Sequence, residues 1–147
     1  MINTNQAGML RESLRLLVRR LGVLERGEAS CCDITLSQCH TIVEIGRAGT
    51  MSLNGLSEIL GLDKSTVSRS IDKLVSDGII LREADPDDRR YLNLRLSEKG
   101  QSIFREVEMR MAGYFEEVIA AIPADKQGQI VESLQYLVQA LKGPRCC

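Results

Sequence analysis

The sequence lacks the features on which most enzymes depend. It contains one histidine, which restricts general acid–base schemes. It carries no glycine-rich phosphate loop, no dinucleotide-binding fingerprint and no zinc-protease motif. Glu116 and Glu117 are adjacent on a predicted helix, so their carboxylates diverge and are better explained as solvated charges than as a catalytic pair. We therefore expect a protein that is not an enzyme.

Long apolar runs and a strong net charge are also missing. No stretch approaches the roughly 20 apolar residues that a membrane-spanning helix needs. Residues 1–20 lack the uninterrupted apolar segment and small-residue cleavage site of a secretory signal. We therefore expect a cytoplasmic protein with no membrane partner. The net charge of −1 neither supports nor excludes a nucleic-acid partner, because such binding depends on where the positive groups lie.

The length and the composition fit a folded domain. A chain of 147 residues, 44% hydrophobic and 27% charged, is long enough to bury a core and is unlike a disordered segment. We predict a single domain over residues 1–147, mainly α-helical with one small β-hairpin.

Helical apolar stripes occupy both ends of the chain. Leucines recur at alternating spacings of four and three from Leu10 to Leu24, which predicts a helix over about 9–26 that Gly27 ends, followed by a loop through Ile34. Ser97 is a good N-cap for a long helix to about residue 122, and a last helix follows from about Asp125. The long helix spans about 37 Å, more than the short central elements can cover. We therefore expect a homodimer joined through segments 9–26 and 98–142, with a monomeric helix bundle as the alternative.

The centre of the chain, about residues 35–97, combines short helices with a hairpin. Thr35 is a candidate cap for a helix to about Gly46, and residues 46–52 predict a turn. Two short helical patterns follow, residues 53–60 and 63–77, separated by Gly61. Residues 79–84 and 91–96 predict two strands, joined by the turn sequence DPDDRR. This order predicts a winged helix-turn-helix, dimerised through the N- and C-terminal helices.

A helix-turn-helix places its second helix in the major groove of DNA, with the residues off the apolar stripe facing the bases. In the second short helix these residues are Ser65, Thr66, Ser68, Arg69, Asp72 and Lys73. The alternative is a solvated helix face. At the hairpin tip, Arg89 and Arg90 suit a narrow minor groove, and Asp87 or Asp88 is close enough to orient a guanidinium group. The two features together favour double-stranded DNA as the partner, although a winged helix that binds protein stays open.

Residues 62–100, LDKSTVSRSIDKLVSDGIILREADPDDRRYLNLRLSEKG, resemble the core of the MarR family of bacterial winged-helix regulators. Asp88 and Arg90 match the family's Asp-x-Arg wing motif, which implies that Arg90 enters the minor groove while Asp88 steadies it. The resemblance implies a dimer that grips two half-sites of a near-palindromic operator. It also implies a repressor released by a small molecule, a metal or oxidation. The family's recognition-helix residues correspond to Ser65, Thr66, Ser68, Arg69 and Lys73.

The cysteines are clustered at two places in the chain. Cys31, Cys32 and Cys39 lie near His40, and Cys146 and Cys147 end the sequence. Cys39 also departs from the family, which often carries a bulky apolar residue there. One hypothesis is a soft-ion site for zinc, copper(I), arsenite or antimonite, with ligands drawn from Cys31, Cys32, Cys39 and His40. A second is thiol oxidation followed by disulfide formation. The third is ordinary packing and surface thiols. If the cysteines carry a signal, this cluster is the candidate input.

Overall fold

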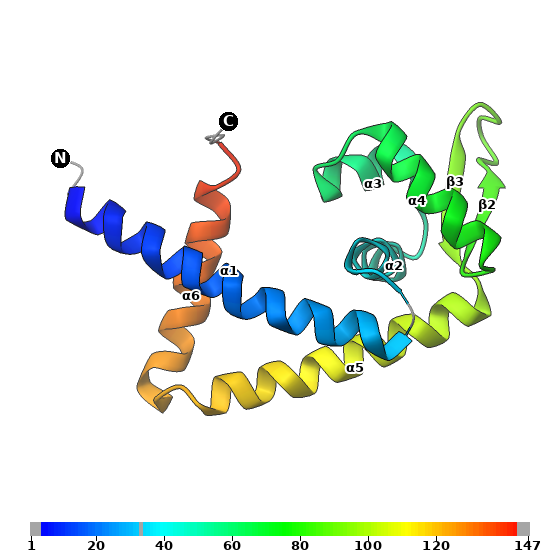
Figure 1. The fold of residues 1–147 in the computed structure, drawn as a ribbon. Helices are drawn as coiled ribbons and strands as arrows, with labels where there is room; N and C mark the ends of the chain where they lie inside the picture. The colour runs from blue at the N-terminus through cyan, green and yellow to red at the C-terminus, as the bar shows by residue number, and fades with distance from the viewer. Residues whose placement is uncertain (1–3, 33, 144–147) are drawn as a thin grey trace. The chain divides into compact units, whose positions relative to one another are not determined.

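The computed structural model describes the backbone of residues 4–32 and 34–143, and their side chains apart from residue 4, residues 23–32 and residue 36. The chain divides into two compact units, one ending at Val107 and the other beginning at Glu108. The helices and strands, drawn in Figure 1, are α1 (Thr4–Cys32), α2 (Leu36–Ala48), β1 (Met51–Ser52), α3 (Leu53–Leu60), α4 (Lys64–Ser76), β2 (Ile80–Ala84), β3 (Leu92–Leu96), α5 (Glu98–Ala120) and α6 (Ala124–Ala140). The predicted class, mainly helical with a small β-wing, is confirmed.

The first unit is organised around α2. Thr35 begins this helix through a capping box, in which its Oγ1 accepts from the Gln38 amide at 3.2 Å and its own amide donates to Gln38 Oε1 at 2.9 Å. A cap of this kind contributes about 1 kcal/mol. Helix α2 packs against α3, α4 and β3, and its Ile42 and Ile45 are fully buried. The predicted cap is therefore confirmed, and α2 is the centre of the core.

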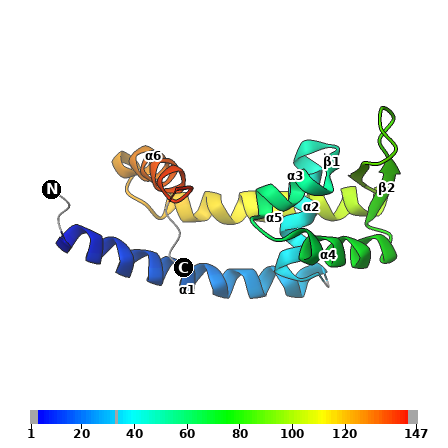
Figure 2. The same cartoon turned by 90° about the horizontal axis from the view of Figure 1, so that it is seen from above.

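The remaining core side chains come from the helix-turn-helix and the sheet. Those that are almost fully buried are Leu56, Val67, Ile71, Leu74, Ile80 and Leu94, and α2 adds Thr41. The strands form one antiparallel sheet in the order β1-β3-β2. Figure 2 shows β1 next to α3 and β2 in the projecting hairpin. Ile80 pairs with Leu96, and Ala84 pairs with Leu92. The predicted hairpin is thus confirmed. Its base, where Ile80 and Leu96 are buried, attaches it to the core.

Two predictions about local structure are wrong. The segment 46–52 was predicted as a turn, yet α2 continues to Ala48 and residues 51–52 form β1, which pairs with β3. The loop predicted from Glu28 onward is helical as far as Cys32, so α1 passes Gly27 without ending. Glycine costs about 1 kcal/mol relative to alanine inside a helix, which the helix formers around it can offset.

The start of α5 is tied closely to the base of the hairpin. Ser97 Oγ accepts from the Gly100 amide at 3.1 Å and donates to the Gly78 carbonyl at 2.5 Å, which confirms Ser97 as the cap of α5. Gly100 lies directly against the carbonyl oxygen of Ile79, so there is no room for a side chain there. The hairpin base and the first turn of α5 therefore form one tight junction.

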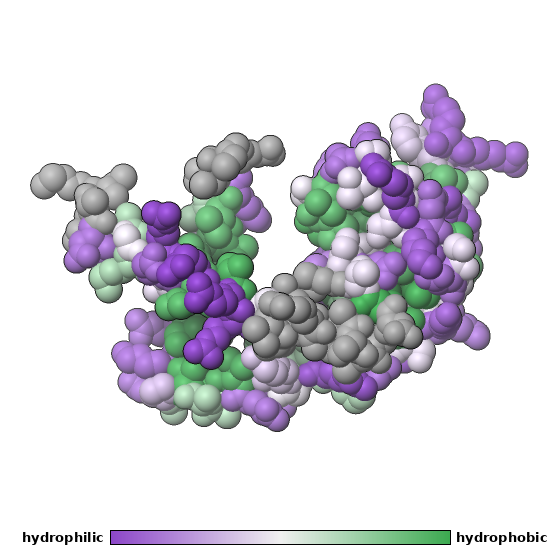
Figure 3. Space-filling view, viewed as in Figure 1, coloured by the Kyte–Doolittle hydropathy of each residue, from purple (hydrophilic) through white to green (hydrophobic). Residues whose placement is uncertain are grey.

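The second unit contains the rest of α5 and all of α6. Helix α6 has no buried residue, although it carries an apolar stripe. The side chains of Val131, Leu134, Val138 and Leu141 are 46%, 44%, 60% and 58% exposed, and the hydrophobic surface over α6 is visible in Figure 3.

No helix that the structure describes combines the length and hydrophobicity of a membrane-spanning segment.

Candidate nucleic-acid interface

Helix α4 presents one apolar face and one polar face. Val67, Ile71 and Leu74 are buried in the core, which fixes the rotation of the helix. The opposite side is solvent-exposed and carries Ser65, Thr66, Arg69, Asp72 and Lys73, with Ser68 half-buried beside them. All of the predicted recognition residues therefore lie together on the side of the helix that faces away from the core.

Asp63 organises the first turn of α4. Its carboxylate accepts from the Thr66 amide at 3.0 Å, from Thr66 Oγ1 at 2.7 Å and from Ser65 Oγ. These bonds, above all the one from the Ser65 hydroxyl, hold the pKa of Asp63 well below its usual range. The sequence pattern gave no sign that Asp63 also binds these two hydroxyl groups.

A second carboxylate, Asp85, shapes the hairpin turn. It accepts from the backbone amides of Asp87 and Asp88 at 2.8 and 3.2 Å and from Asn93 Nδ2 at 3.0 Å. The bond from the Asp87 amide is the main cause of its lowered pKa. Because an ionised carboxylate satisfies several turn donors at once, the wing tip has a defined conformation.

Arg90 is held at this tip by Asp88. Its Nε donates to Asp88 Oδ1 at 3.0 Å and its Nη2 to Oδ2 at 2.8 Å, a two-pronged pair. The hydrogen bond lowers the pKa of Asp88 and raises that of Arg90. The Arg90 side chain nevertheless remains 84% exposed. Arg89, also exposed, has no hydrogen bond or ion pair with any residue that the structure describes. The tip thus carries one oriented guanidinium group and one unrestrained one.

The wing and α4 are also joined to each other. Arg82 of β2 forms an ion pair with Asp72 on the polar face of α4. Across the hairpin, Arg95 Nε donates to Glu83 Oε1 at 2.7 Å, which lowers the pKa of Glu83. Sequence reasoning missed the contribution of Arg82, because its partner lies on a different element.

Comparisons with known proteins agree with this geometry. The family description "MarR family" matches residues 34–92, which include α2, the helix-turn-helix and most of the wing. This central part of the chain is therefore similar to the MarR family.

Relatives and solved structures extend the MarR-family likeness over most of the chain. The regulator BilQ of Clostridium symbiosum is 25% identical over 113 residues, 77% of this chain and 78% of that protein. The multiple antibiotic resistance protein MarR of Salmonella typhimurium is 27% identical over 110 residues, 74% of each chain. Among solved structures, Streptococcus pneumoniae FabT in complex with DNA matches with a TM-score of 0.84 at 25% identity, covering 92% of this chain and 97% of that one. A MarR family protein from Bacillus stearothermophilus matches with a TM-score of 0.86 at 22% identity, covering 97% and 99%.

The similarity to the MarR family bears on two expectations. The fold is the winged helix-turn-helix of these proteins, with α4 as the second helix of the motif and the β2–β3 hairpin as the wing. MarR-family regulators are not enzymes, which agrees with the missing catalytic motifs.

The structure describes only part of the predicted cysteine cluster. Cys39 is 7% exposed and packs with the core residues of α2, whereas its neighbour His40 is exposed. The side chains of Cys31 and Cys32, and the whole of Cys146 and Cys147, lie outside the described residues. Among the side chains that are described, no three His, Cys, Asp or Glu groups come together as metal ligands would.

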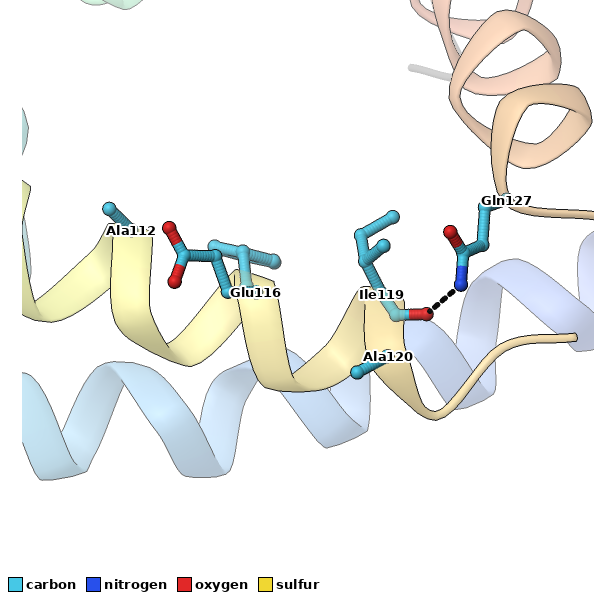
Figure 4. A pocket seen from close by; sticks show the side chains of 6 residues that line it. Ala112, Glu116, Ile119, Ala120 and Gln127 are labelled. Atoms are coloured by element: carbon cyan, nitrogen blue, oxygen red, sulfur yellow. Dashed lines mark hydrogen bonds between the residues drawn. The ribbon is translucent and has the colours of Figure 1, made fainter. Parts of the chain in front are cut away.

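A shallow apolar depression lies in the second unit, where α5 meets α6 (Figure 4). Its volume is about 570 Å³ and it is wide open to solvent. The residues that line it are Ala112, Phe115, Glu116, Ile119, Ala120 and Gln127. Gln127 closes one side by donating to the Ile119 and Ile122 carbonyls, each at 3.1 Å.

Proposed function

We propose that this protein binds operator DNA as a homodimer and represses transcription until a signal lowers its affinity. The observation that carries the proposal is the exposed Arg90, held at the wing tip by Asp88 while the wing itself is linked to α4 through Arg82 and Asp72. A guanidinium group oriented before binding loses less side-chain entropy when it enters a narrow minor groove. The neighbouring major groove is then available to the polar face of α4.

Relatives support DNA as the ligand. Streptococcus pneumoniae FabT and a mutant of Escherichia coli MarR were both crystallised with DNA, in the second case operator DNA. The Escherichia coli structure matches this chain with a TM-score of 0.74, covering 96% of this chain and 99% of that one, at 23% identity.

The proposed homodimer rests on apolar side chains that the chain leaves uncovered. Helix α6 buries none of its residues, and in α1 the side chains of Leu10, Leu17 and Val18 are 47%, 41% and 67% exposed. A soluble monomer rarely exposes apolar stripes of this length, because covering them releases about 25 cal/mol per Å². A second copy of the chain supplies a complementary stripe and gives two recognition helices for a near-palindrome.

The cysteines are proposed as the signal input, acting through oxidation or through a soft ion such as zinc, copper(I) or arsenite. Cys39 supports this idea because it is buried in α2, the helix on which α3, α4 and β3 pack. A modification there would disturb the packing of the DNA-binding unit. An organic ligand acting on a regulator whose cysteines are structurally neutral is the alternative.

DNA binding is tested with a duplex selected from a randomised pool. Arg90→Ala should weaken binding roughly tenfold or more, as expected for the loss of a specific groove contact. Arg69→Ala should also weaken it. Arg105→Ala, which removes an equal charge from an exposed position on α5, is the matched control. If binding is the same for all three variants and the wild type, the winged helix is a protein-interaction module instead.

The dimer is tested by light scattering, where the expected mass is twice the 16.3 kDa of the chain. Leu134→Glu places a charge in the α6 stripe and should lower the measured mass towards that of one chain. A wild-type protein of one chain mass would contradict the dimer.

The signal is tested by comparing DNA binding of the wild type and an all-serine variant with zinc, arsenite or peroxide. Responses that persist without thiols would exclude the cysteines.

A further inference from the structure

The first turn of α4 contains a donor–acceptor arrangement that the proposed DNA binding does not require. Both hydroxyl groups at the start of the recognition helix, those of Ser65 and Thr66, bond to the single carboxylate of Asp63. Both residues are exposed on the side of α4 that is proposed to face DNA. The direction of these two bonds determines what the hydroxyls can offer to a base or a phosphate.

The direction follows from the chemistry of the carboxylate. The pKa of Asp63 is held far below neutral, so the group carries no proton and can only accept. Each hydroxyl has one proton and two lone pairs, and the proton is therefore donated to Asp63. Only lone pairs remain available toward the solvent.

We propose that Asp63 is a positioning residue that makes Ser65 and Thr66 into hydrogen-bond acceptors, so that the start of α4 selects bases carrying an exocyclic amino group in the major groove. Only adenine N6 and cytosine N4 donate there, whereas guanine and thymine present acceptors. Phosphate oxygens are also acceptors, so these two hydroxyls are unsuited to contacts with the DNA backbone. This inference rests on the proposed binding of DNA by α4.

The variant Asp63→Asn separates this role from simple helix capping, because asparagine and aspartate are similar N-caps. The amide oxygen can take the place of Oδ2 and accept from the Thr66 amide, which now lies 3.0 Å from Oδ2. The amide NH₂ then takes the place of Oδ1, 2.7 Å from Thr66 Oγ1, and donates to it. The Thr66 hydroxyl would thus become a donor toward DNA while the fold is kept.

The experiment uses the wild type, Asp63→Asn and Thr66→Val. The matched control is Ser76→Ala, because Ser76 is exposed at the far end of α4 and lies outside the residues proposed to contact DNA. Duplexes selected by the wild type are then resynthesised, one enriched adenine or cytosine at a time. Each is replaced by a base analogue that lacks only the exocyclic amino group. Fluorescence anisotropy then gives Kd. At one position or more in each half-site, removal of the amino group should lower the affinity of the wild type and of Ser76→Ala by roughly 3- to 10-fold, the value of one hydrogen bond. At the same position, removal of the amino group should lower the affinity of Asp63→Asn and Thr66→Val less than about twofold.

The alternative outcomes are distinguishable. Equal losses in the wild type and in Thr66→Val at every position would overturn the assignment while leaving DNA binding intact. A wild-type protein that binds no duplex better than Arg90→Ala does would instead refute the proposed function. Thermal melts that match the wild type confirm that Asp63→Asn is folded.

Discussion

Gly100→Ala tests the junction that connects the wing to α5. A Cβ atom at residue 100 would contact the Ile79 carbonyl oxygen directly and lie 3.1 Å from Leu96 Cβ and 3.3 Å from the Ile79 carbonyl carbon. The obstacle is backbone, which cannot rotate away as a side chain would. The same carbonyl accepts the Ser97 amide at 2.9 Å, so moving it also strains the cap of α5.

The expected magnitude combines opposing effects. Overpacking against an immobile group costs about 3 kcal/mol, and a weakened hydrogen bond costs about 1 kcal/mol. Replacing glycine by alanine in a helix regains about 1 kcal/mol. The free energy of unfolding should therefore fall by about 3 kcal/mol, which lowers Tm by roughly 6 to 12 °C in a chain of this size.

The assay is thermal unfolding by circular dichroism, with Gly113→Ala as the control in the same helix. Nothing lies within 4 Å of a Cβ built at Gly113, so that variant should melt at or slightly above the wild-type temperature. A steric clash at residue 100 is ruled out if the Tm of Gly100→Ala lies within about 2 °C of the Tm of Gly113→Ala, because the predicted difference in Tm is larger.

Three further predictions concern the interface. Arg82→Ala leaves Asp72 unpaired on α4, so DNA affinity should fall about fivefold. The double variant Arg82→Ala/Asp72→Ala should regain part of this affinity. If it regains none, Arg82 acts through a group other than Asp72. Because hydrogen bonds lower the folded pKa of Asp85 and Asp88, their stabilisation of the wing is present above the ordinary pKa of 3.8 and is lost as the pH falls through the lower folded values. The protection of wing amides against hydrogen exchange, expressed relative to the intrinsic exchange rate at each pH, should therefore be constant from about pH 5 to 8 and fall only in stronger acid. Thr35→Ala removes the cap of α2 and should lower Tm by roughly 2 to 4 °C, whereas an unchanged Tm would mean that packing alone fixes this helix end.

The elements that could be predicted from sequence are those whose signals are local. Thr35, Asp63 and Ser97 each lie three residues before the amide that they cap, so a short pattern contains both partners. The hairpin likewise follows from alternation in residues 91–96 and from the turn between the strands. The face of α4 follows from its period alone, because three buried residues fix which side is exposed.

The features that were missed depend on partners distant in the sequence. Strand β1 has two residues and exists only because β3, about forty positions later, pairs with it. Arg82 could be seen to neutralise Asp72 only once the wing was folded against α4. The end of α1 was misjudged for another reason, since glycine lowers helix stability without forbidding a helix.

The start of α5 is joined firmly to the wing. Its first turn is fixed to the wing base, because Gly100 leaves no space against Ile79 and Ser97 bonds to Gly78. Half-sites about 34 Å apart tolerate little displacement of the two DNA-binding units. We therefore propose that the signal releases the operator by changing the separation of the two α4 helices in the dimer. A signal-bound structure in which this separation is unchanged would rule the proposal out.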